Sequence, residues 1–465
     1  MKLNRAAHDS LFRPGKVNRP NSVGAVRDRD STGRLAAFIP FLALGYVLIF
    51  VNLLVISVPG EGTANDPAPN IGNRVFWPGL LFLTLALAVR YRSRFSWDFL
   101  RAPAIAGLVA YMILAGASIA WAFSPEHAIN RYLFQMMLVT AVILPFAIEP
   151  FAADTLRKIY IWYALAIVIN VVWLLFERPQ LTEAGAVFGY RGYFTFKGYL
   201  GECASVAILI SLYELRSSGW RRLCALALIS VSIWVVFMSN SKGSLAFAIL
   251  APVLAAPMLV ASNRLRVPVN AIVAIIVGLY FLASSVSSNL VGNIAYDFYG
   301  DSSLTGRTII WDFIQGQISR NPWFGWGFHS FWLVGPTSPS VTEAPDWVRH
   351  MTGSHSGYLD VKLETGYFGY ALLIFFILAT VHAIARVART DLFRAWILLS
   401  LVLFIALTNL LETVWFQNDP LWVVFLLVAA DATRYRNSKV DNALKSKARN
   451  RITPYNLTAR KSAPS

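Results

Sequence analysis

The stretch "GSHSGYLDVKLETGYFGYALLIFFILATVHAIAR", residues 353–386, joins a polar segment directly to a long apolar one. From residue 367 onward it is apolar and long enough to cross a bilayer as a helix, because about 20 residues suffice. Its first part instead carries His355, Asp360, Lys362 and Glu364. A helix gains nothing from such groups as it enters a bilayer. The first part is therefore predicted to be either a solvated edge or the wall of a site.

Apolar blocks of this kind recur along the chain of 465 residues, of which 56% are hydrophobic and 14% charged. With a mean hydropathy of +0.53, the chain is too apolar for a soluble domain of its size. The blocks predict an all-α integral membrane protein with about twelve transmembrane helices. The predicted spans lie near residues 35–58, 75–91, 102–123, 133–148, 158–176, 199–215, 221–238, 243–261, 267–285, 367–386, 394–411 and 420–433. No small-residue cleavage pattern follows the first block, so we expect a retained span rather than a signal peptide.

Lys and Arg are distributed unequally between the two predicted sides of the membrane. With the N-terminus inside, the inner loops and both tails hold 31 of the 41 basic residues, and the outer segments hold 10. The positive-inside rule then predicts that both termini are cytoplasmic. The predicted organisation is a basic, disordered tail at 1–34, nine spans within 35–285, an outer loop with short helices at 286–366, three spans within 367–433, and a second basic tail at 434–465.

The net charge of +16 follows from the same distribution. Basic tails and short inner loops would meet anionic lipid headgroups at the membrane surface. Nucleic-acid binding is disfavoured because the tails lack aromatic residues and any recognisable binding fold. Cys203 and Cys224 fall within predicted spans and are interpreted as small core residues rather than a disulfide or a metal pair.

Within the outer loop, "GRTIIWDFIQGQISRNPWFGWG" at 306–327 predicts a helix that is followed by a turn. Ser303 or Thr305 would cap its start, and Pro322 would stop it. Four-residue spacing gives it an apolar stripe of Ile309, Phe313, Ile310 and Ile314, and a second face of Arg307, Trp311 and Gln315. The later "SHSGYLDVKLETG" predicts another short helix, ended by Gly366. The loop's tryptophans would form a folded layer on the membrane, stack on sugars, or belong to an interfacial aromatic belt.

Cationic or titratable side chains persist in outer segments that otherwise shed positive charge, namely Arg191, Lys197, Lys242, Arg307 and His355. Together they predict an anionic ligand on that side, and the planar guanidinium of Arg is well matched to phosphate oxygens. Each has a structural alternative. An Arg can anchor a span at the interface, a Lys is common at span ends, and a lone His is more often structural than catalytic. His329 and His350 are rivals for any catalytic role of His355.

Several classes of activity lack their motifs. The chain has no GxxxxGK[ST] sequence for ATP-driven transport and no HExxH or Cys/His cluster for zinc. Ser241 precedes Lys242, but sequence neighbours rarely form a serine–lysine hydrolase. Asp297 and Asp301 are weak candidates for a divalent ion. No metal site is therefore predicted.

Four motifs in order carry a resemblance: "G…RGYF…K…LGE", "SNSKGS", "GR…IW…I…NPWFGWGFHSFW" and "HSGYLDVKLETGYFGY". Over residues 185–430 the chain resembles the O-antigen ligase and polymerase family, which includes exopolysaccharide polymerases. The resemblance implies an all-helical, GT-C-like membrane glycosyltransferase. Such an enzyme acts at the periplasmic face of the bacterial inner membrane on glycans carried by undecaprenyl pyrophosphate.

The resemblance also implies roles for particular residues. The family's functional arginines correspond to Arg191 and Arg307, and its histidine to His355. Here His355 precedes a Ser where the family more often has Asn, and "KGYLG" departs from the common exopolysaccharide pattern. The expected site has Arg191, Arg307 and His355 as catalytic residues, with substrate contacts from Lys197, Lys242, Trp311, Asp360 and Glu364.

The expected reaction is a direct displacement with inversion that uses no metal and no other cofactor. His355 would take the acceptor proton, with Glu364 or Asp360 orienting it, unless these two carboxylates merely belong to a solvated helix face. A polymerase is favoured; an O-antigen ligase that transfers glycan to a lipid core is the alternative. A lipid-linked glycan flippase is disfavoured because charges gather in outer segments. Expected partners are the lipid-linked donor, a glycan acceptor, membrane lipids, and flippase, chain-length or export proteins, with no nucleic acid.

Overall fold

A computed structural model describes residues 35–53, 62–63, 66–67, 70–148, 154–181, 187–273, 275 and 306–434. The first expected tail, nearly all of the second, most of the ninth expected span, and the weak metal candidates Asp297 and Asp301 lie outside the described residues.

Helices dominate the part of the chain that the structure describes, as expected. The longer ones are α4 (Ile71–Arg90), α6 (Pro103–Ala117), α7 (Pro125–Ile148), α8 (Thr155–Leu174), α9 (Lys197–Glu214), α10 (Trp220–Ser239), α11 (Lys242–Leu265), α14 (Arg307–Arg320), α16 (Gly357–Ala388) and α17 (Leu392–Thr408). The shorter ones are α2 (Ile39–Gly45), the π-helix η1 (Tyr46–Phe50), α3 (Val51–Leu53), η2 (Arg92–Arg94), α5 (Trp97–Leu100), η3 (Ser118–Trp121), α15 (Pro339–Thr342) and η4 (Asp346–His350). Residues 420–434 are also helical. Two antiparallel ribbons pair β1 (Gly62–Thr63) with β2 (Asp66–Pro67), and β3 (Gln180–Leu181) with β4 (Val187–Gly189).

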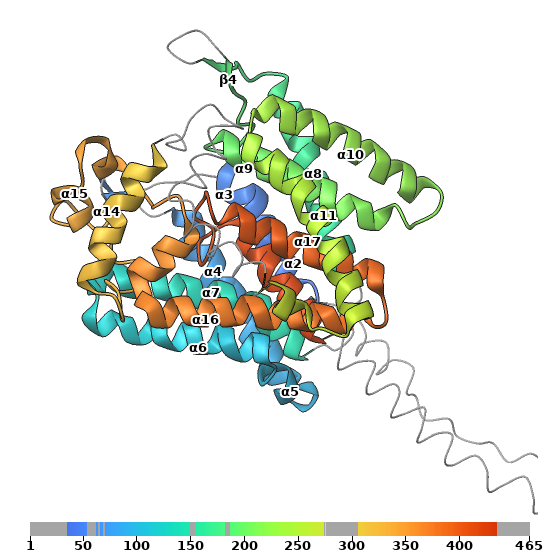
Figure 1. Cartoon of the computed structure of the whole chain (residues 1–465), viewed down its shortest axis with the longest axis horizontal. Helices are drawn as coiled ribbons and strands as arrows, with labels where there is room; N and C mark the ends of the chain where they lie inside the picture. Colours follow the sequence, from blue (N-terminus) through green and yellow to red (C-terminus); the bar gives the residue numbers. More distant parts are fainter. Residues whose placement is uncertain are drawn as a thin grey trace, which may run out of the picture.

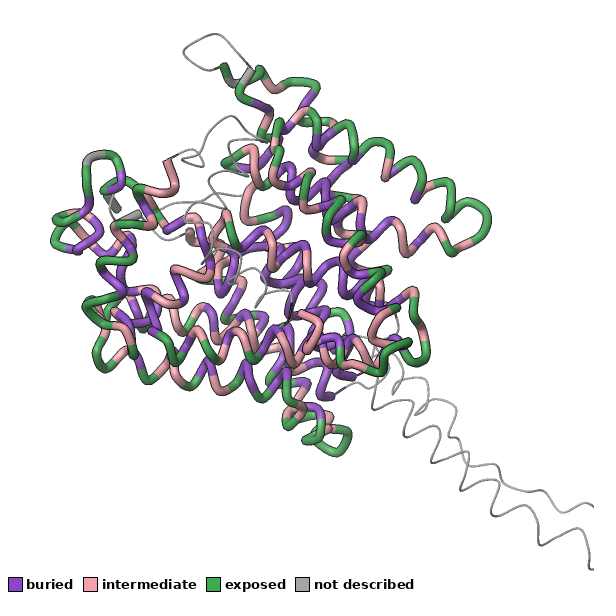
Figure 2. The backbone as a smooth tube through the Cα atoms, in the orientation of Figure 1, coloured by how far each residue is buried: buried purple, intermediate pink, exposed green. Residues whose placement is uncertain are grey.

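The helices pack around a central helix formed by residues 420–434. Every residue from Leu421 to Ala430 in it is at most 2% exposed, as expected of a helix that is apolar on all sides. Around it α6 lies along α16, α9 contacts α8, α10 and α11, and α17 contacts α11 (Figure 1). The buried backbone is concentrated in the middle of the molecule (Figure 2). In Figure 1, α14 and α15 lie at the left and β4 at the top, whereas α5 lies at the bottom.

Exposed apolar side chains indicate where the bundle meets lipid. Val75 and Phe82 on α4 are 71% and 76% exposed, and Phe237 on α10 is 61% exposed. Such surfaces are unusual on soluble monomers. Seven described helices are long and apolar enough to cross a membrane. Together, these features define a helical membrane protein.

The expected number of about twelve spans is only partly matched. The seven long apolar helices are α4, α6 continued through η3, α7, α8, α10, α11 and α16. The expected first and eleventh spans appear as the shorter apolar helices Ile39–Leu53 and Leu392–Thr408. The expected sixth and twelfth correspond to α9 and residues 420–434, which are helical but not among the seven. Twelve spans and a periplasmic loop remain predictions.

The predicted interruption at Gly366 is present inside α16. Gly366 has φ +66° and ψ −166°, which divides α16 into a short polar part and a long apolar part. The Trp323 backbone lies where a Cβ on Gly366 would stand. The residues after Gly325 form hydrogen bonds with the last residues before the bend. Trp326 N donates to Leu363 O and Gly327 N to Glu364 O, both at 2.9 Å. The "NPWFGWG" motif thus docks the end of α14 onto the kink of α16.

The helix predicted before that motif is α14. It ends at Arg320, ahead of Pro322 as expected, but Gly306 at φ +81° occupies the N-cap position that Ser303 or Thr305 was expected to fill. The expected stripe is half right. Ile310 and Ile314 are buried, whereas Ile309 is 46% exposed.

Candidate functional site

The Glu412 carboxylate joins two of the predicted catalytic residues. Arg307 Nη2 donates to Glu412 Oε1 at 2.8 Å, and His355 Nδ1 lies 3.2 Å from Glu412 Oε2. The side chains of His355 and Glu412 are 42% and 38% exposed, and that of Arg307 is 20% exposed. A cation, a carboxylate and an imidazole therefore meet in a place that substrate can reach.

Three separate segments supply these side chains. Arg307 is the first residue of α14, His355 lies in the turn before α16, and Glu412 follows α17. Gly357 N donates to both Asn409 O and Glu412 O at 3.0 Å, which fastens the turn of His355 to the segment of Glu412. His355 itself has φ +53°, a conformation that few non-glycine residues adopt. Such strain persists only where the surroundings enforce it.

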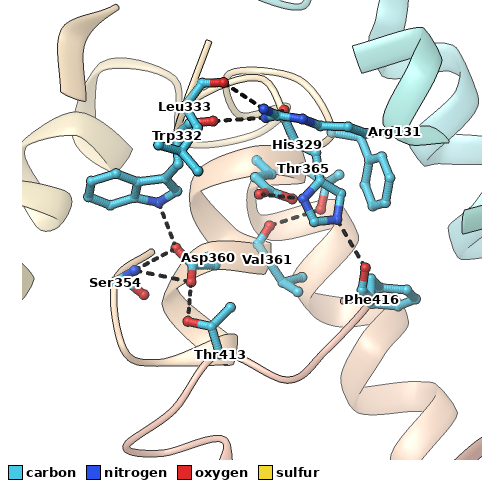
Figure 3. A network of polar contacts seen from close by, with 12 residues as sticks. Arg131, His329, Trp332, Leu333, Ser354, Asp360, Val361, Thr365, Thr413 and Phe416 are labelled. Atoms are coloured by element: carbon cyan, nitrogen blue, oxygen red, sulfur yellow. Dashed lines mark hydrogen bonds and ion pairs between the residues drawn. The ribbon is translucent and has the colours of Figure 1, made fainter. Parts of the chain in front are cut away.

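Asp360 fixes the segments that carry His355 and Glu412 through buried hydrogen bonds. It is 3% exposed and accepts from Trp332 Nε1 at 3.0 Å, Ser354 N at 3.2 Å and Thr413 Oγ1 at 2.6 Å (Figure 3). One buried carboxylate thus ties together the loop at 332, the turn of His355 and the segment of Glu412. The alternative of a solvated helix face is wrong for Asp360, and its bonds reach the turn of His355 through Ser354 and not the imidazole itself. Its contacts are those of a positioning residue.

Glu364 is also buried, and it faces a different histidine. It is 5% exposed, and its Oε1 lies 3.6 Å from His329 Nδ1. His329 Nε2 lies 3.0 Å from Phe416 O. Burial, helped by the positive charge of Arg131, lowers the pKa of His329 to about 4. Glu364 thus faces His329 and not His355, and the side chain of the rival His329 is 14% exposed, much less than that of His355 at 42%.

Arg131, which the sequence analysis did not single out, fixes the loop that contains His329. Its Nη1 donates to His329 O at 2.7 Å and to Trp332 O at 2.8 Å, and its Nη2 to Leu333 O at 2.6 Å (Figure 3). His329 and Leu333 both have positive φ, so this loop is held in a demanding conformation. A guanidinium with several donors in one plane suits this task.

Trp311 lies on the same face of α14 as Arg307, as predicted, and binds the turn of His355. Its Nε1 donates to Ser354 O at 3.0 Å. Among the other outer tryptophans, Trp326 donates to Gln317 O and Trp332 to Asp360, whereas Trp323 and Trp347 are 60% and 40% exposed. The indoles of Trp311, Trp326 and Trp332 therefore join segments of the loop together.

The remaining predicted cations form a second group near β4. Lys197 Nζ donates to Phe188 O at 2.9 Å and to Asn240 O at 3.4 Å. Asn240 precedes Lys242 by two residues in the sequence, so the two lysines lie in the same region. Arg191 is half exposed, and its backbone N–H donates to Glu177 Oε1 at 3.0 Å. Arg191, Lys197 and Lys242 thus lie around β4 and the ends of α9 and α10, whereas Arg307 and His355 meet at Glu412.

No group of three or more His, Cys, Asp and Glu side chains that could hold a metal ion occurs in the described part of the chain. What the site offers is a general base candidate, cations for an anionic ligand, and hydrogen-bonding groups.

Fold and site together define a helical membrane protein with a polar, cation-bearing site built by loops and helix ends. Residues 224–374 match the family model described as O-antigen ligase. The match includes Lys242, Arg307, Trp311, His355, Asp360 and Glu364, and excludes Arg191, Lys197 and Glu412. The match is confined to residues 224–374, and over that part of the chain it confirms the predicted resemblance to the O-antigen ligase and polymerase family. A search of curated proteins finds no significant match.

The matched family is named for O-antigen ligase activity, and the seven long apolar helices of the described residues indicate a multi-pass membrane protein.

Proposed function

We propose that the protein extends glycans by transferring oligosaccharide repeat units from undecaprenyl pyrophosphate at the periplasmic face of the inner membrane. The contact of His355 and Arg307 with one carboxylate, Glu412, carries this proposal. It places a base candidate beside a cation, which is the pairing that the reaction requires.

His355 would act as the general base. A Glu412 carboxylate can only accept hydrogen bonds, so the hydrogen of the neutral imidazole belongs on Nδ1, and Nε2 keeps its lone pair. That lone pair would take the proton of the acceptor hydroxyl as its oxygen bonds to the anomeric carbon. This is the arrangement in which a carboxylate fixes the tautomer of a catalytic histidine.

The leaving group needs positive charge rather than a proton. As the bond between the anomeric carbon and the pyrophosphate oxygen breaks, the bonding electrons leave with the pyrophosphate. Arg307 would stabilise this charge at the site, and Arg191, Lys197 and Lys242 would bind the phosphates or the glycan that follows them. The attack is from the opposite face of the sugar, so the anomeric configuration inverts, and no step calls for a metal or another cofactor.

The alternative is transfer of a finished glycan to a lipid core, as an O-antigen ligase does. The matched family is named O-antigen ligase, which supports this alternative. The two activities share a donor and differ in the acceptor. A strain lacking the protein separates them, if its undecaprenyl-linked glycans and surface polysaccharide are extracted and sized. Single repeat units on the lipid with no polymer would indicate a polymerase, and long polymer stranded on the lipid a ligase. Unchanged glycans in both pools would contradict both activities.

A further inference from the structure

A cavity of about 150 Å³ lies between the π-helix η1, the beginning of α9 and the segment that precedes helix 420–434. We call it the acidic cavity, because the carboxyl groups of Glu202 and Asp419 line it, together with Asn418 and the rings of Tyr163, Phe194 and Tyr199. Glu202 and Asp419 are 5% and 4% exposed. Its volume corresponds to about five water molecules of ~30 Å³ each.

The acidic cavity holds polar groups that the protein leaves unsatisfied. In the described part of the chain, Asn418 Oδ1 and the Tyr163 hydroxyl are buried without a hydrogen-bond partner, and no hydrogen bond from these residues reaches the Glu202 carboxyl. Asp419 Oδ1 accepts from Leu421 N at 2.7 Å. A buried acceptor that lacks a donor costs stability. The cavity is therefore built for a ligand that brings donors of its own.

One wall of the cavity has irregular backbone. Val47 and Leu48 line it from within a π-helical turn, and Leu48 O accepts from the Tyr193 hydroxyl at 3.0 Å. Single π-helical turns occur often at functional sites, since their backbone groups depart from the regular helical pattern. This irregularity is an independent sign that the cavity has a binding role.

The acidic cavity lies close to the site described above. Asp419 and Glu412 belong to the same short connection between α17 and helix 420–434. Burial, and to a smaller extent the nearby Glu412 carboxylate, raises the pKa of Asp419. Asp419, which lines the cavity, is therefore within electrostatic range of the carboxylate that contacts Arg307 and His355.

We propose that the acidic cavity binds one sugar ring of the lipid-linked glycan, with the Glu202 carboxyl accepting hydrogen bonds from its hydroxyl groups. Hydroxyl donors match the unsatisfied acceptors, and the aromatic walls match the apolar faces of a sugar ring. The volume of about 150 Å³ has room for one ring. This inference depends on the proposed function, because it names a subsite for the same substrate.

Two lipids test it with the full-length protein in detergent. One is the undecaprenyl-linked glycan extracted from a strain lacking the protein, and the other is undecaprenyl pyrophosphate without sugar. Glu202→Leu should bind the first lipid about tenfold or more weakly and the second as wild type does, since only the sugar contacts are lost. Glu202→Gln, which keeps the shape of the side chain, should show a smaller loss and covers the case in which the Leu variant does not fold.

The matched control is Glu214→Gln. Glu214 is also a buried Glu on α9, but it lies at the other end of that helix and forms an ion pair with Arg221 at 2.6 Å. It should leave both affinities unchanged. If Glu202→Leu bound the glycosylated lipid like wild type, or lost both lipids equally, the sugar subsite would be wrong. A wild-type protein that bound neither lipid would instead overturn the proposed function, and this inference with it.

Discussion

At the scale of single residues, the Glu412 carboxylate brings the side chains of Arg307 and His355 together in one site. Arg307 and His355 come from segments about fifty residues apart in sequence, and each contacts a different oxygen of the Glu412 carboxylate. The proposed chemistry needs this bridge, because it sets the tautomer of the histidine and the position of the guanidinium.

Glu412→Gln should lower the rate of glycan transfer by about 10²-fold while the protein still inserts and binds lipid. The amide nitrogen of Gln donates hydrogen bonds, whereas His355 and Arg307 both need an acceptor. Transfer is measured with purified protein and extracted lipid-linked glycan. If Glu412 acts through His355, the double variant with His355→Ala should be no slower than His355→Ala alone. Multiplicative losses would show that the two residues act independently.

Arg307→Lys should reduce transfer at least tenfold, since the charge survives but the planar fork does not. Arg320→Lys is the matched control. Arg320 lies on the same helix, is 54% exposed and pairs with Glu343, away from the site, and the exchange should leave the rate unchanged. Equal rates for both variants would remove the guanidinium of Arg307 from the mechanism.

At the scale of elements, the site depends on how α14 docks onto the kink of α16. The backbone of Trp323 in the "NPWFGWG" motif occupies the space of a side chain on Gly366, and the backbone of Glu364 occupies that of a side chain on Gly325 within the motif. Asp360 and Arg131 then hold the loops between these elements. The turn of His355 is therefore fixed by packing that lies outside the site itself.

Gly366→Ala should lower the free energy of unfolding by about 2 kcal/mol or more and so lower the melting temperature. The φ of +66° and the Trp323 backbone both exclude a Cβ at this position. Thermal unfolding in detergent measures the change. Gly316→Ala on α14 is the control, since nothing lies within 4 Å of a Cβ placed there, and it should be neutral or slightly stabilising. Similar melting of both variants would argue against a structural role for the kink.

Much of this element-scale arrangement is visible in the sequence. The stop of α14 before Pro322 and the break at Gly366 follow from local chemistry, since Pro lacks the N–H that a helix interior needs and Gly readily adopts a positive φ. Pairing across the fold is not local. Asp360 and Glu364 were expected near His355 because they are close in sequence, yet Asp360 binds Trp332 and Thr413, and Glu364 faces His329. Glu412 is not predicted by the distribution of basic residues, although an acidic residue in the short connection between two apolar segments is a usable signal.

At the scale of the whole molecule, the buried helix 420–434 and the exposed apolar faces of α4 and α10 explain the high hydropathy of the chain. The central helix is surrounded by protein, whereas the outer helices present apolar side chains to lipid. The topology predicted from basic residues places the site on the outer side and both tails inside.

Labelling tests that topology in a background without Cys203 and Cys224. A cysteine in place of Glu343 should react with a membrane-impermeant thiol reagent in intact cells, and one in place of Asp391 should react only after lysis. Positive charge in the inner loops is the physical reason. The reverse pattern would put the site of Arg307 and His355 on the cytoplasmic side and contradict the proposed location.

The role of His355 is tested most directly by comparing wild type with His355→Ala in detergent, using lipid-linked glycan extracted from a strain that lacks the protein. Protein amounts are matched, and glycan length is followed with time. We predict a loss of about 10²–10⁴ in the rate of transfer, with binding of the lipid retained, because a general base contributes that much. Normal transfer by the variant would contradict the assignment of His355 as the base and leave it as a structural residue of the turn before α16.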